Sequence, residues 1–421
     1  MGVFDKKWQV FALVGVSIFM STLDSSIVNV ALPYIMEDLA SDVKTVQWVV
    51  VVYLLTVSSL LLTFGRLSDI QGRRKVYVVG FFVFTLGSLL CGQSVTSQML
   101  VCARAVQGVG ASMLMACSPA LVVDAFGPEE RGKALGMMGA VVAAGLTLGP
   151  LAGGVILAYF SWRLIFYINV PIGVMAVAAG MLVLRGLPGG SGSGEPLDKR
   201  GSLLLVAFLC SLIVTLVRSP DLGFVSVKSG LGLMTAAACG LGFFVNEKRC
   251  PYPLLDLDLM KIRMFVLPLI SSAILFASLF ILVFMMPFFL TYPAGLTAAR
   301  TGLVMIVPFL FLLVISPISG MLADRLGSRM LCTLGMAFMV LSLFSLIFLS
   351  PEKGVAAVVW RMALAGIGTA LFVSPNNTAI MGAVPLHQRG IASGAAATAR
   401  TLGMVSGVAL AGTIFSAFIS F

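Results

Sequence analysis

The decapeptide GRLSDIQGRR at residues 65–74 returns as GMLADRLGSR at residues 320–329. Its Gly, Leu, Asp, Gly and Arg recur at a constant separation of 255 residues. A second pattern, RG followed by four spaced glycines, begins at residue 131 and recurs 258 residues later, at residue 389. Repetition at fixed spacing over so many positions predicts two structurally equivalent halves within one chain. Each decapeptide follows a long apolar run, as expected of parallel repeats in a membrane protein.

The composition excludes an ordinary soluble protein. Of the 421 residues, 59% are apolar and 10% are charged, against about 25% charged residues in soluble domains. Most of the surface must therefore face lipid or other apolar helices. Nucleic-acid binding, a soluble enzyme core and a secreted disulfide scaffold are poorly supported. The seven Cys form no CxxC pair and His387 is the single His, so we expect no metal site.

Thirteen apolar runs are candidates for bilayer-crossing helices, which need about 20 residues each. They lie at Val10–Pro33, Val46–Phe64, Val76–Cys91, Met99–Val123, Ala134–Tyr159, Leu164–Leu184, Ser202–Val217, Leu231–Val245, Phe265–Leu290, Leu303–Ala323, Met330–Leu349, Val355–Ile380 and Ile391–Ile419.

The basic residues between these runs predict the orientation of the chain. With the N-terminus inside, 18 Lys and Arg fall in inner loops and 6 in outer loops, while 3 Arg lie within the runs. Such a bias over short loops predicts a cytoplasmic N-terminus in the cell membrane. The net charge of +10 therefore reflects membrane topology.

We expect an all-α membrane protein made of two pseudo-symmetric helix bundles. Residues 1–185 form an N-terminal six-helix bundle, residues 186–263 a linker with two inserted helices, and residues 264–421 a C-terminal bundle. The linker starts with the Gly/Ser-rich stretch Gly186–Gly194, whose composition favours flexibility. The second bundle has five spans against six in the first, so we expect a truncated or atypical chain that lacks its last helix.

Three further motifs carry a family resemblance. They are LDSSIVNVALP at residues 23–33, RAVQGVG at residues 104–110 and GLTLGPLAGG at residues 145–154. With the decapeptide, they resemble the motifs of the major facilitator superfamily, and of its fourteen-span drug:proton antiporter subfamily. The resemblance covers essentially the whole chain and implies the major facilitator fold, alternating access and proton-coupled export. It implies no cofactor beyond the proton gradient, and the lack of a GxxxxGK[ST] motif gives no support to ATP-driven export.

Asp24 is the one acidic residue deep inside an apolar run. Helical spacing places it on one face with Ser17 and Ser21, so we expect a polar stripe directed at a water-filled cavity. Burial disfavours the charged carboxylate, and an intramembrane acid can exchange a proton for a cation. A purely structural carboxyl is the alternative. The resemblance implies that Arg104, supported by Gln107, sets the proton affinity of Asp24, whereas a snorkelling Arg104 is the alternative.

Two further arginines lie in apolar runs of the second half. Arg361 begins its run, and we expect it to snorkel to the interface. Arg400 lies roughly 15 Å into its run, where it needs an acceptor that the sequence does not identify. Asn376 and Asn377 either face a cavity or bond across helices. Three intramembrane Arg against one Asp keep an anionic or zwitterionic substrate open.

The glycines of the second repeated pattern are candidates for gating. Gly145, Gly149 and Gly153 recur every four residues, so two helix backbones can approach closely along that face. Pro150 removes a helix hydrogen bond and bends the span. Tight packing alone is one interpretation. The resemblance favours, for these residues and Gly154, an interface that opens and closes during alternating access.

The decapeptide and its repeat supply the remaining gating candidates. The resemblance implies that Asp69 lies near the N-terminus of the thirteenth span, where the helix dipole favours a carboxylate. There it would close an inner gate together with Arg73 and Arg74, whereas a solvated loop acid is the alternative. The other candidates in these segments are Gly65, Gly72, Asp324 and Arg329.

We therefore predict a secondary active transporter, not an enzyme, that exports lipophilic small molecules in exchange for protons. Its partners are the small-molecule substrate, protons and the lipid bilayer, with no nucleic acid, while the sequence leaves the oligomeric state undefined. Three alternatives stay open. They are a dedicated exporter of one metabolite, including an anionic one; a transport-inactive membrane sensor or scaffold; and an uptake symporter, which the span-five glycine motif disfavours.

Overall fold

The computed structural model describes residues 5–127, 129–185, 196–222, 226–255, 257–385 and 389–418. Within these ranges the chain is helical with connecting turns and no β-strand, which confirms the predicted all-α class. The Gly/Ser-rich stretch 186–194 and His387 lie outside the described residues. The helices are α1 (Lys6–Asp38), α2 (Val43–Gln71), α3 (Arg73–Gly92), α4 (Ser97–Ala125), α5 (Arg131–Tyr159), α6 (Leu164–Tyr167), α7 (Asn169–Val183), α8 (Lys199–Leu222), α9 (Val227–Arg249), α10 (Arg263–Thr291), α11 (Ala298–Met305), α12 (Val307–Leu326), α13 (Ser328–Leu346), α14 (Gly354–Gly382) and α15 (Arg389–Phe418).

The number of long helical spans agrees with the thirteen apolar runs. Twelve spans in the described part of the chain are long and apolar enough to cross a membrane, and α15 adds a helix of 30 residues. Two of the spans are broken, between α6 and α7 and between α11 and α12. Pro171 and Pro308 follow these breaks, and neither can donate the backbone hydrogen bond that would continue the preceding helix.

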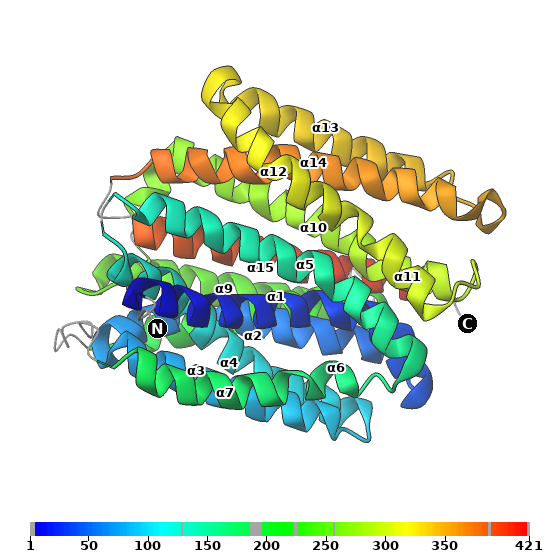
Figure 1. Ribbon diagram of the computed structural model, residues 1–421, viewed down its shortest axis with the longest axis horizontal. Coiled ribbons are helices and arrows are strands. Elements are labelled where there is room, and N and C mark those ends of the chain that lie inside the picture. The colour runs from blue at the N-terminus through cyan, green and yellow to red at the C-terminus, as the bar shows by residue number, and fades with distance from the viewer. Residues whose placement is uncertain are drawn as a thin grey trace.

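The helices form one elongated bundle in which they run roughly side by side (Figure 1). In the first half, α1 packs against α5 and α4, while α3 packs against α4 and α7. In the second half, α10 packs against α15, and α14 lies between α12 and α13. The additional pair lies beside both sets, because α9 packs on α8, and α8 packs against α2 of the first half and α15 of the second.

The repeat seen in the sequence is also present in the backbone. Gly72 ends α2 with φ 94° and Gly327 ends α12 with φ 79°. Both values lie in the left-handed region that favours glycine. The same sharp turn therefore follows the same helix of each half, 255 residues apart.

The two halves meet through reciprocal contacts. A Cβ on Gly302 of α11 would come within 2.5 Å of the Pro150 carbonyl oxygen of α5, so these backbones are in direct contact. Gly412 of α15 lies against the side-chain amide of Gln47 of α2. Gly302 is the repeat equivalent of Gln47, 255 residues later, and Gly412 is the repeat equivalent of Gly154, 258 residues later. The contact of α11 with α5 and the contact of α15 with α2 therefore involve equivalent pairs of helices. This reciprocity is typical of an approximate two-fold arrangement.

The α5 contact with the second half is confined to one end of the molecule. We call the end with Lys7, Arg73 and Arg131 the basic end, and the opposite one, with Asp38 and Arg163, the distal end. The contact between α5 and the second half begins at Thr147, whose hydroxyl donates to the Phe309 carbonyl at 3.1 Å. It continues from there toward the distal end. In the first half of α5, Gly132, Gly136 and Gly139 have space for a Cβ with no atom within 4 Å. Along α5 the halves therefore touch distally and separate toward the basic end.

Candidate functional site

Asp24 lies at the centre of a buried polar network in the first half. Its Oδ2 accepts a hydrogen bond from Arg104 Nη1 at 2.5 Å, and its Oδ1 accepts one from Gln107 Nε2 at 2.9 Å. Asp24, Arg104 and Gln107 are all 0% exposed. Because Arg104 and Gln107 stand one helical turn apart on α4, both reach the carboxyl from the same side. The three residues singled out in the sequence therefore do come together.

Arg104 is held by several groups besides the carboxylate. Its Nε donates to the Val49 carbonyl of α2 at 3.0 Å, and its Nη1 also donates to the Gln107 Oε1 at 2.7 Å. The guanidinium carbon lies 4.0 Å from the centre of the Tyr53 ring. This guanidinium does not snorkel to an interface. The opposite charge of Asp24 and the further acceptors offset the cost of burying this guanidinium.

Two further polar residues, which the sequence did not identify as part of the site, complete the network. Ser88 of α3 accepts hydrogen bonds from Gln107 and from Asn169, both at 3.1 Å, and donates to the Phe166 carbonyl at 3.0 Å. Asn169 starts α7 and also donates to Asp24 at 3.4 Å. The helix break before Pro171 positions Asn169. An isolated Asn or Ser in an apolar run is too common to be singled out as part of a site from sequence.

The polar stripe on α1 does not face a water-filled cavity in this conformation, contrary to our expectation. Ser17 accepts a hydrogen bond from the Tyr77 hydroxyl at 2.7 Å, and Ser21 is 2% exposed. Both point into the helices of the first half, as does Asp24. Helical spacing identifies a common face, but only the neighbouring helices decide whether that face meets water or protein.

Arg361 also differs from its prediction. It lies two turns inside α14 and is 5% exposed, so it does not snorkel. Its Nε donates to the Ser345 carbonyl at 2.8 Å and its Nη1 to the Ala357 carbonyl at 2.5 Å. The guanidinium carbon lies 4.3 Å from the Trp360 ring centre. Backbone carbonyls and an aromatic ring therefore hold this cation within the second half.

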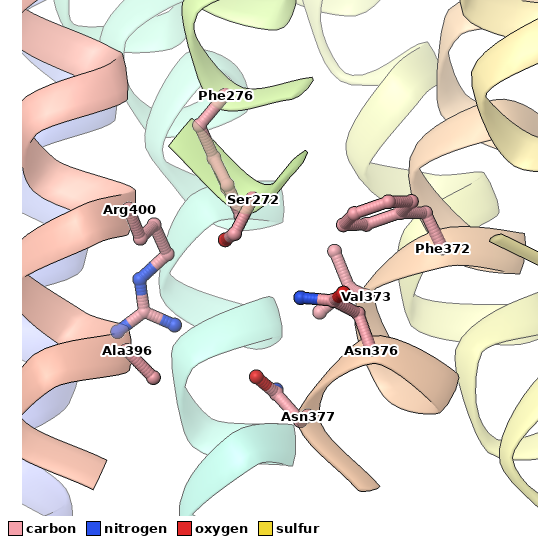
Figure 2. Close-up of a pocket in the computed structure, with 8 residues that line it drawn as sticks. All are labelled: Ser272, Phe276, Phe372, Val373, Asn376, Asn377, Ala396 and Arg400. Atoms are coloured by element: carbon pink, nitrogen blue, oxygen red, sulfur yellow. The ribbon is translucent and has the colours of Figure 1, made fainter. Parts of the chain in front are cut away.

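Arg400 and the two asparagines line a cavity in the second half, which we call the Arg400 pocket. Figure 2 shows the guanidinium of Arg400 directed from α15 toward Asn377 of α14, with Ser272 of α10 on the opposite side. Asn376 donates to the Pro268 carbonyl at 3.1 Å, whereas Asn377 is exposed. In this conformation the pocket has a volume of about 10 Å³, roughly the space of one water molecule. Its lining residues are Ser272, Phe276, Phe372, Val373, Asn376, Asn377, Ala396 and Arg400.

The glycine motif of α5 serves two different surfaces. Gly145, Gly149 and Gly153 lie against α1 of the same half, where the backbone of α5 approaches Thr22, Ser26 and Ile27. Pro150 and Gly154 of the motif contact α11 of the second half. Together with Thr147, which donates to the Phe309 carbonyl, this pair places the motif at the boundary between the halves.

The charged residues of the decapeptide form a network at the basic end. Arg73 pairs with Asp69 at 3.1 Å and with Asp124 of α4, while Arg74 donates to the Met181 carbonyl at 2.8 Å. This network links α2, α3, α4 and α7 of the first half. No described contact joins Asp69 to α15, so its expected position near the N-terminus of that helix stays a prediction.

The other gating candidates make few interactions. A Cβ added at Gly65 would have no atom within 4 Å, and Arg329 is exposed. The side chain of Asp324 lies outside the described part of the structure. The decapeptide of the second half therefore offers no described counterpart to the Arg73 network.

Comparison with known proteins identifies the family. The profile of the Major Facilitator Superfamily matches residues 14–408. The chain belongs to the major facilitator superfamily. It is therefore a multi-pass membrane transporter and not an enzyme, as the sequence predicted.

Relatives within the superfamily include transporters of different substrates. The riboflavin transporter RibZ of Clostridioides difficile is 34% identical over 99% of this chain and 90% of its own length. The multidrug resistance protein Stp of Mycobacterium tuberculosis is also 34% identical, over 96% of this chain and 75% of its own length.

A solved structure supports the fold. A bacterial homologue of the human lysosomal transporter Spinster has a TM-score of 0.66 at 13% identity, covering 98% of this chain and 82% of the other. At this identity the similarity concerns the fold alone, and it agrees with the predicted major facilitator architecture.

Proposed function

We propose that this protein exports lipophilic small molecules across the cell membrane in exchange for protons, with no cofactor other than the proton gradient. The observation that carries the proposal is the fully buried Asp24 carboxylate, paired with Arg104 at 2.5 Å. A carboxyl in such a place is either charged beside a cation or neutral with a proton. The Asp24 carboxyl can therefore bind and release one proton.

The network explains how the proton would couple to movement of the helices. In this conformation Asp24 is sealed, and its carboxylate is satisfied by groups from α4 and α7. Protonation removes the negative charge that holds Arg104, so the ion pair between α1 and α4 weakens. Rearrangement of these helices then gives the carboxyl access to water, and the proton enters or leaves. Gln107, Asn169 and Ser88 act in this scheme by orienting the carboxyl.

Alternating access follows from the contacts between the halves. Segments 1–185 and 264–421 rock against each other in this proposal, and segment 186–263 supplies the additional helices beside them. The basic end faces the cytoplasm, as the Lys and Arg bias predicts. The α5 contact is closed distally at Pro150, Gly154 and Gly302, so this conformation would accept substrate from the cytoplasmic side. Asp69, Arg73 and Arg74 stabilise that open side within the first half and re-form contacts when it closes.

A dedicated exporter of one metabolite is a second candidate, favoured by the similarity to a riboflavin transporter over nearly the whole chain. The two candidate functions differ in the range of substrates that the protein exports. Everted membrane vesicles with an imposed pH gradient, challenged in turn with cationic ethidium, anionic fluorescein and riboflavin, distinguish them. Collapse of the gradient by several unrelated compounds supports multidrug export, and collapse by riboflavin alone supports the dedicated exporter.

The proton site is tested by Asp24→Asn in the same vesicles. We expect substrate-induced proton movement to fall to the level of empty vesicles, because the amide cannot exchange a proton. Since this substitution leaves Arg104 without a counter-charge, the double variant Asp24→Asn/Arg104→Gln is measured beside it. Asp38→Asn, at the distal end beside Arg163, is the control and should keep coupled export. Proton movement that survives in both Asp24 variants would overturn the assignment, as would a wild type in which substrate moves no protons.

A further inference from the structure

Of the three arginines that lie within the apolar runs of the sequence, two have their charge compensated by protein groups. Arg104 faces a carboxylate. Arg361 donates to two backbone carbonyls. Both arrangements offset the large cost of removing a guanidinium from water. The third arginine, Arg400, differs from both in the groups around its guanidinium.

Arg400 lacks any such compensation. In the described part of the chain, no carboxylate pairs with it and no protein group accepts a hydrogen bond from its guanidinium. Its one described contact is with the Phe276 ring, whose centre lies 5.9 Å from the guanidinium carbon. A guanidinium keeps its charge at every physiological pH. Arg400 is therefore a fixed positive charge in the second half that awaits an acceptor.

The surroundings of Arg400 suit an anion with an apolar or aromatic body. The Asn377 amide and the Ser272 hydroxyl border the space that the guanidinium enters (Figure 2). Phe276 and Phe372 form its apolar walls. Guanidinium binds a carboxylate or phosphate through two parallel hydrogen bonds, and neutral amides and hydroxyls supply further donors without adding competing negative charge.

The size of the pocket limits what it can hold. Pockets that enclose whole drug-sized ligands have volumes of roughly 300–1,000 Å³, and this one has about 10 Å³ in the described conformation, roughly the space of one water molecule. The helices around it therefore have to separate slightly before a carboxylate or phosphate group can enter. Since Asn377 is exposed, the rest of a bound molecule can extend out of the pocket.

We propose that the Arg400 pocket binds a carboxylate or phosphate group of the transported molecule, so that the protein favours anionic over cationic substrates. This inference rests on the proposed transport function and adds the charge of its substrate. Arg400 supplies the charge, Asn377 and Ser272 orient the anion, and Phe276 contacts the adjoining ring. Asp24 takes no part in this binding, because its charge is already paired with Arg104.

Benzoate tests this proposal, since it joins a carboxylate to a small aromatic ring. Its binding to the purified protein is measured by titration calorimetry, with benzylamine as the cation of the same shape. We expect benzoate to bind and benzylamine not to. Arg400→Gln should weaken benzoate binding by at least about tenfold, the range expected for loss of a charged hydrogen-bond donor. Arg400→Lys keeps the charge without the two-pronged geometry and should fall between them.

The control is Arg329→Gln, which removes an exposed charge at the basic end and should leave benzoate binding unchanged. Failure of wild type to bind benzoate, equal binding of benzylamine, or unchanged binding in Arg400→Gln would each overturn the proposal. The double variant Asp24→Asn/Arg104→Gln should still bind benzoate. A wild type that binds benzoate but moves no protons with substrate would contradict the proposed function and leave this inference standing.

A phospholipid phosphate carries the same chemistry as a substrate phosphate, so the source must be distinguished. Benzoate titrations are repeated in nanodiscs of phosphatidylcholine and of phosphatidylglycerol, and co-purified lipid is quantified for wild type and Arg400→Gln. We expect benzoate affinity to be independent of the lipid. Strong competition by phosphatidylglycerol, with lipid lost from Arg400→Gln, would show a lipid site and overturn the assignment to substrate.

Discussion

At the scale of single residues, the same side-chain type serves three purposes in this transporter. Arg104 balances a buried carboxylate, Arg361 binds backbone carbonyls, and Arg400 enters a cavity. Their difference lies in the acceptors around them, because the guanidinium itself is always charged. Residue type therefore determines that a charge is present, and the neighbours determine whether it is available to a ligand.

A double-mutant cycle measures how strongly Asp24 and Arg104 depend on each other. Either Asp24→Asn or Arg104→Gln alone should lower the free energy of unfolding by about 3–5 kcal/mol, because each leaves a charge buried without its partner. The double variant should lose clearly less than the sum. Stability is measured by denaturant unfolding in detergent.

The exposed pair Asp38 and Arg163, at 2.7 Å, gives the matched comparison. Its cycle should yield a coupling of about 0–1 kcal/mol. If the losses at Asp24 and Arg104 simply add, the two charges are not coupled and the central network has another origin.

At the scale of elements, the helices of the two halves meet where glycine replaces larger side chains. Gly302 and Pro150 bring α11 and α5 into backbone contact, and Gly412 lies against Gln47 where α15 meets α2. Such close approach allows two helices to separate and return without interlocking side chains. It also makes each contact sensitive to a single added methyl group.

Gly302→Ala should open the distal contact along α5. A Cβ there would lie 2.5 Å from the Pro150 carbonyl oxygen, and overpacking of this kind costs about 1–3 kcal/mol. The conformation described here would lose population, and the export rate would fall. Distances between spin labels on the distal ends of α5 and α11, measured by pulsed electron paramagnetic resonance, report the separation.

Gly139→Ala on α5 is the matched control, because no atom lies within 4 Å of its Cβ position. It should leave the distances and the export rate unchanged. Equal effects of the two variants would mean that helix flexibility, and not contact between the halves, is what the substitutions alter.

At the scale of the whole molecule, the charges within the described spans predict how transport responds to the membrane potential. In the proposed mechanism the Asp24 carboxyl carries one proton per cycle. Import of one proton with export of a monoanion moves two positive charges inward. Export of a monocation in the same exchange moves none.

Transport of an anionic substrate should therefore depend on the potential. With the pH gradient removed, an inside-negative potential set by potassium and valinomycin should still drive export from right-side-out vesicles, measured as loss of entrapped substrate. Because two charges cross the membrane per cycle, each 100 mV of potential contributes about 4.6 kcal/mol to the driving force for export. Export that does not respond to the potential would contradict either the single proton or the anionic substrate, and a parallel measurement of proton uptake separates the two.

Much of this architecture could be predicted from the sequence. Membrane location, thirteen spans and two similar halves follow from the apolar runs and from the repeat, because helical backbone must satisfy its own hydrogen bonds in lipid. Asp24 and Arg104 were also identifiable, since charged residues in apolar runs are rare enough to stand out, and Gln107 lies one helical turn from Arg104.

Only the tertiary structure decided which groups surround those charges. It placed Ser88 and Asn169 beside Asp24, turned the α1 stripe away from water, held Arg361 among carbonyls and left Arg400 facing a cavity. The physical reason is that the free energy of a buried polar group depends on its hydrogen-bond partners and exposure to water. Those partners come from helices far apart in the chain, so no local pattern of residues specifies them.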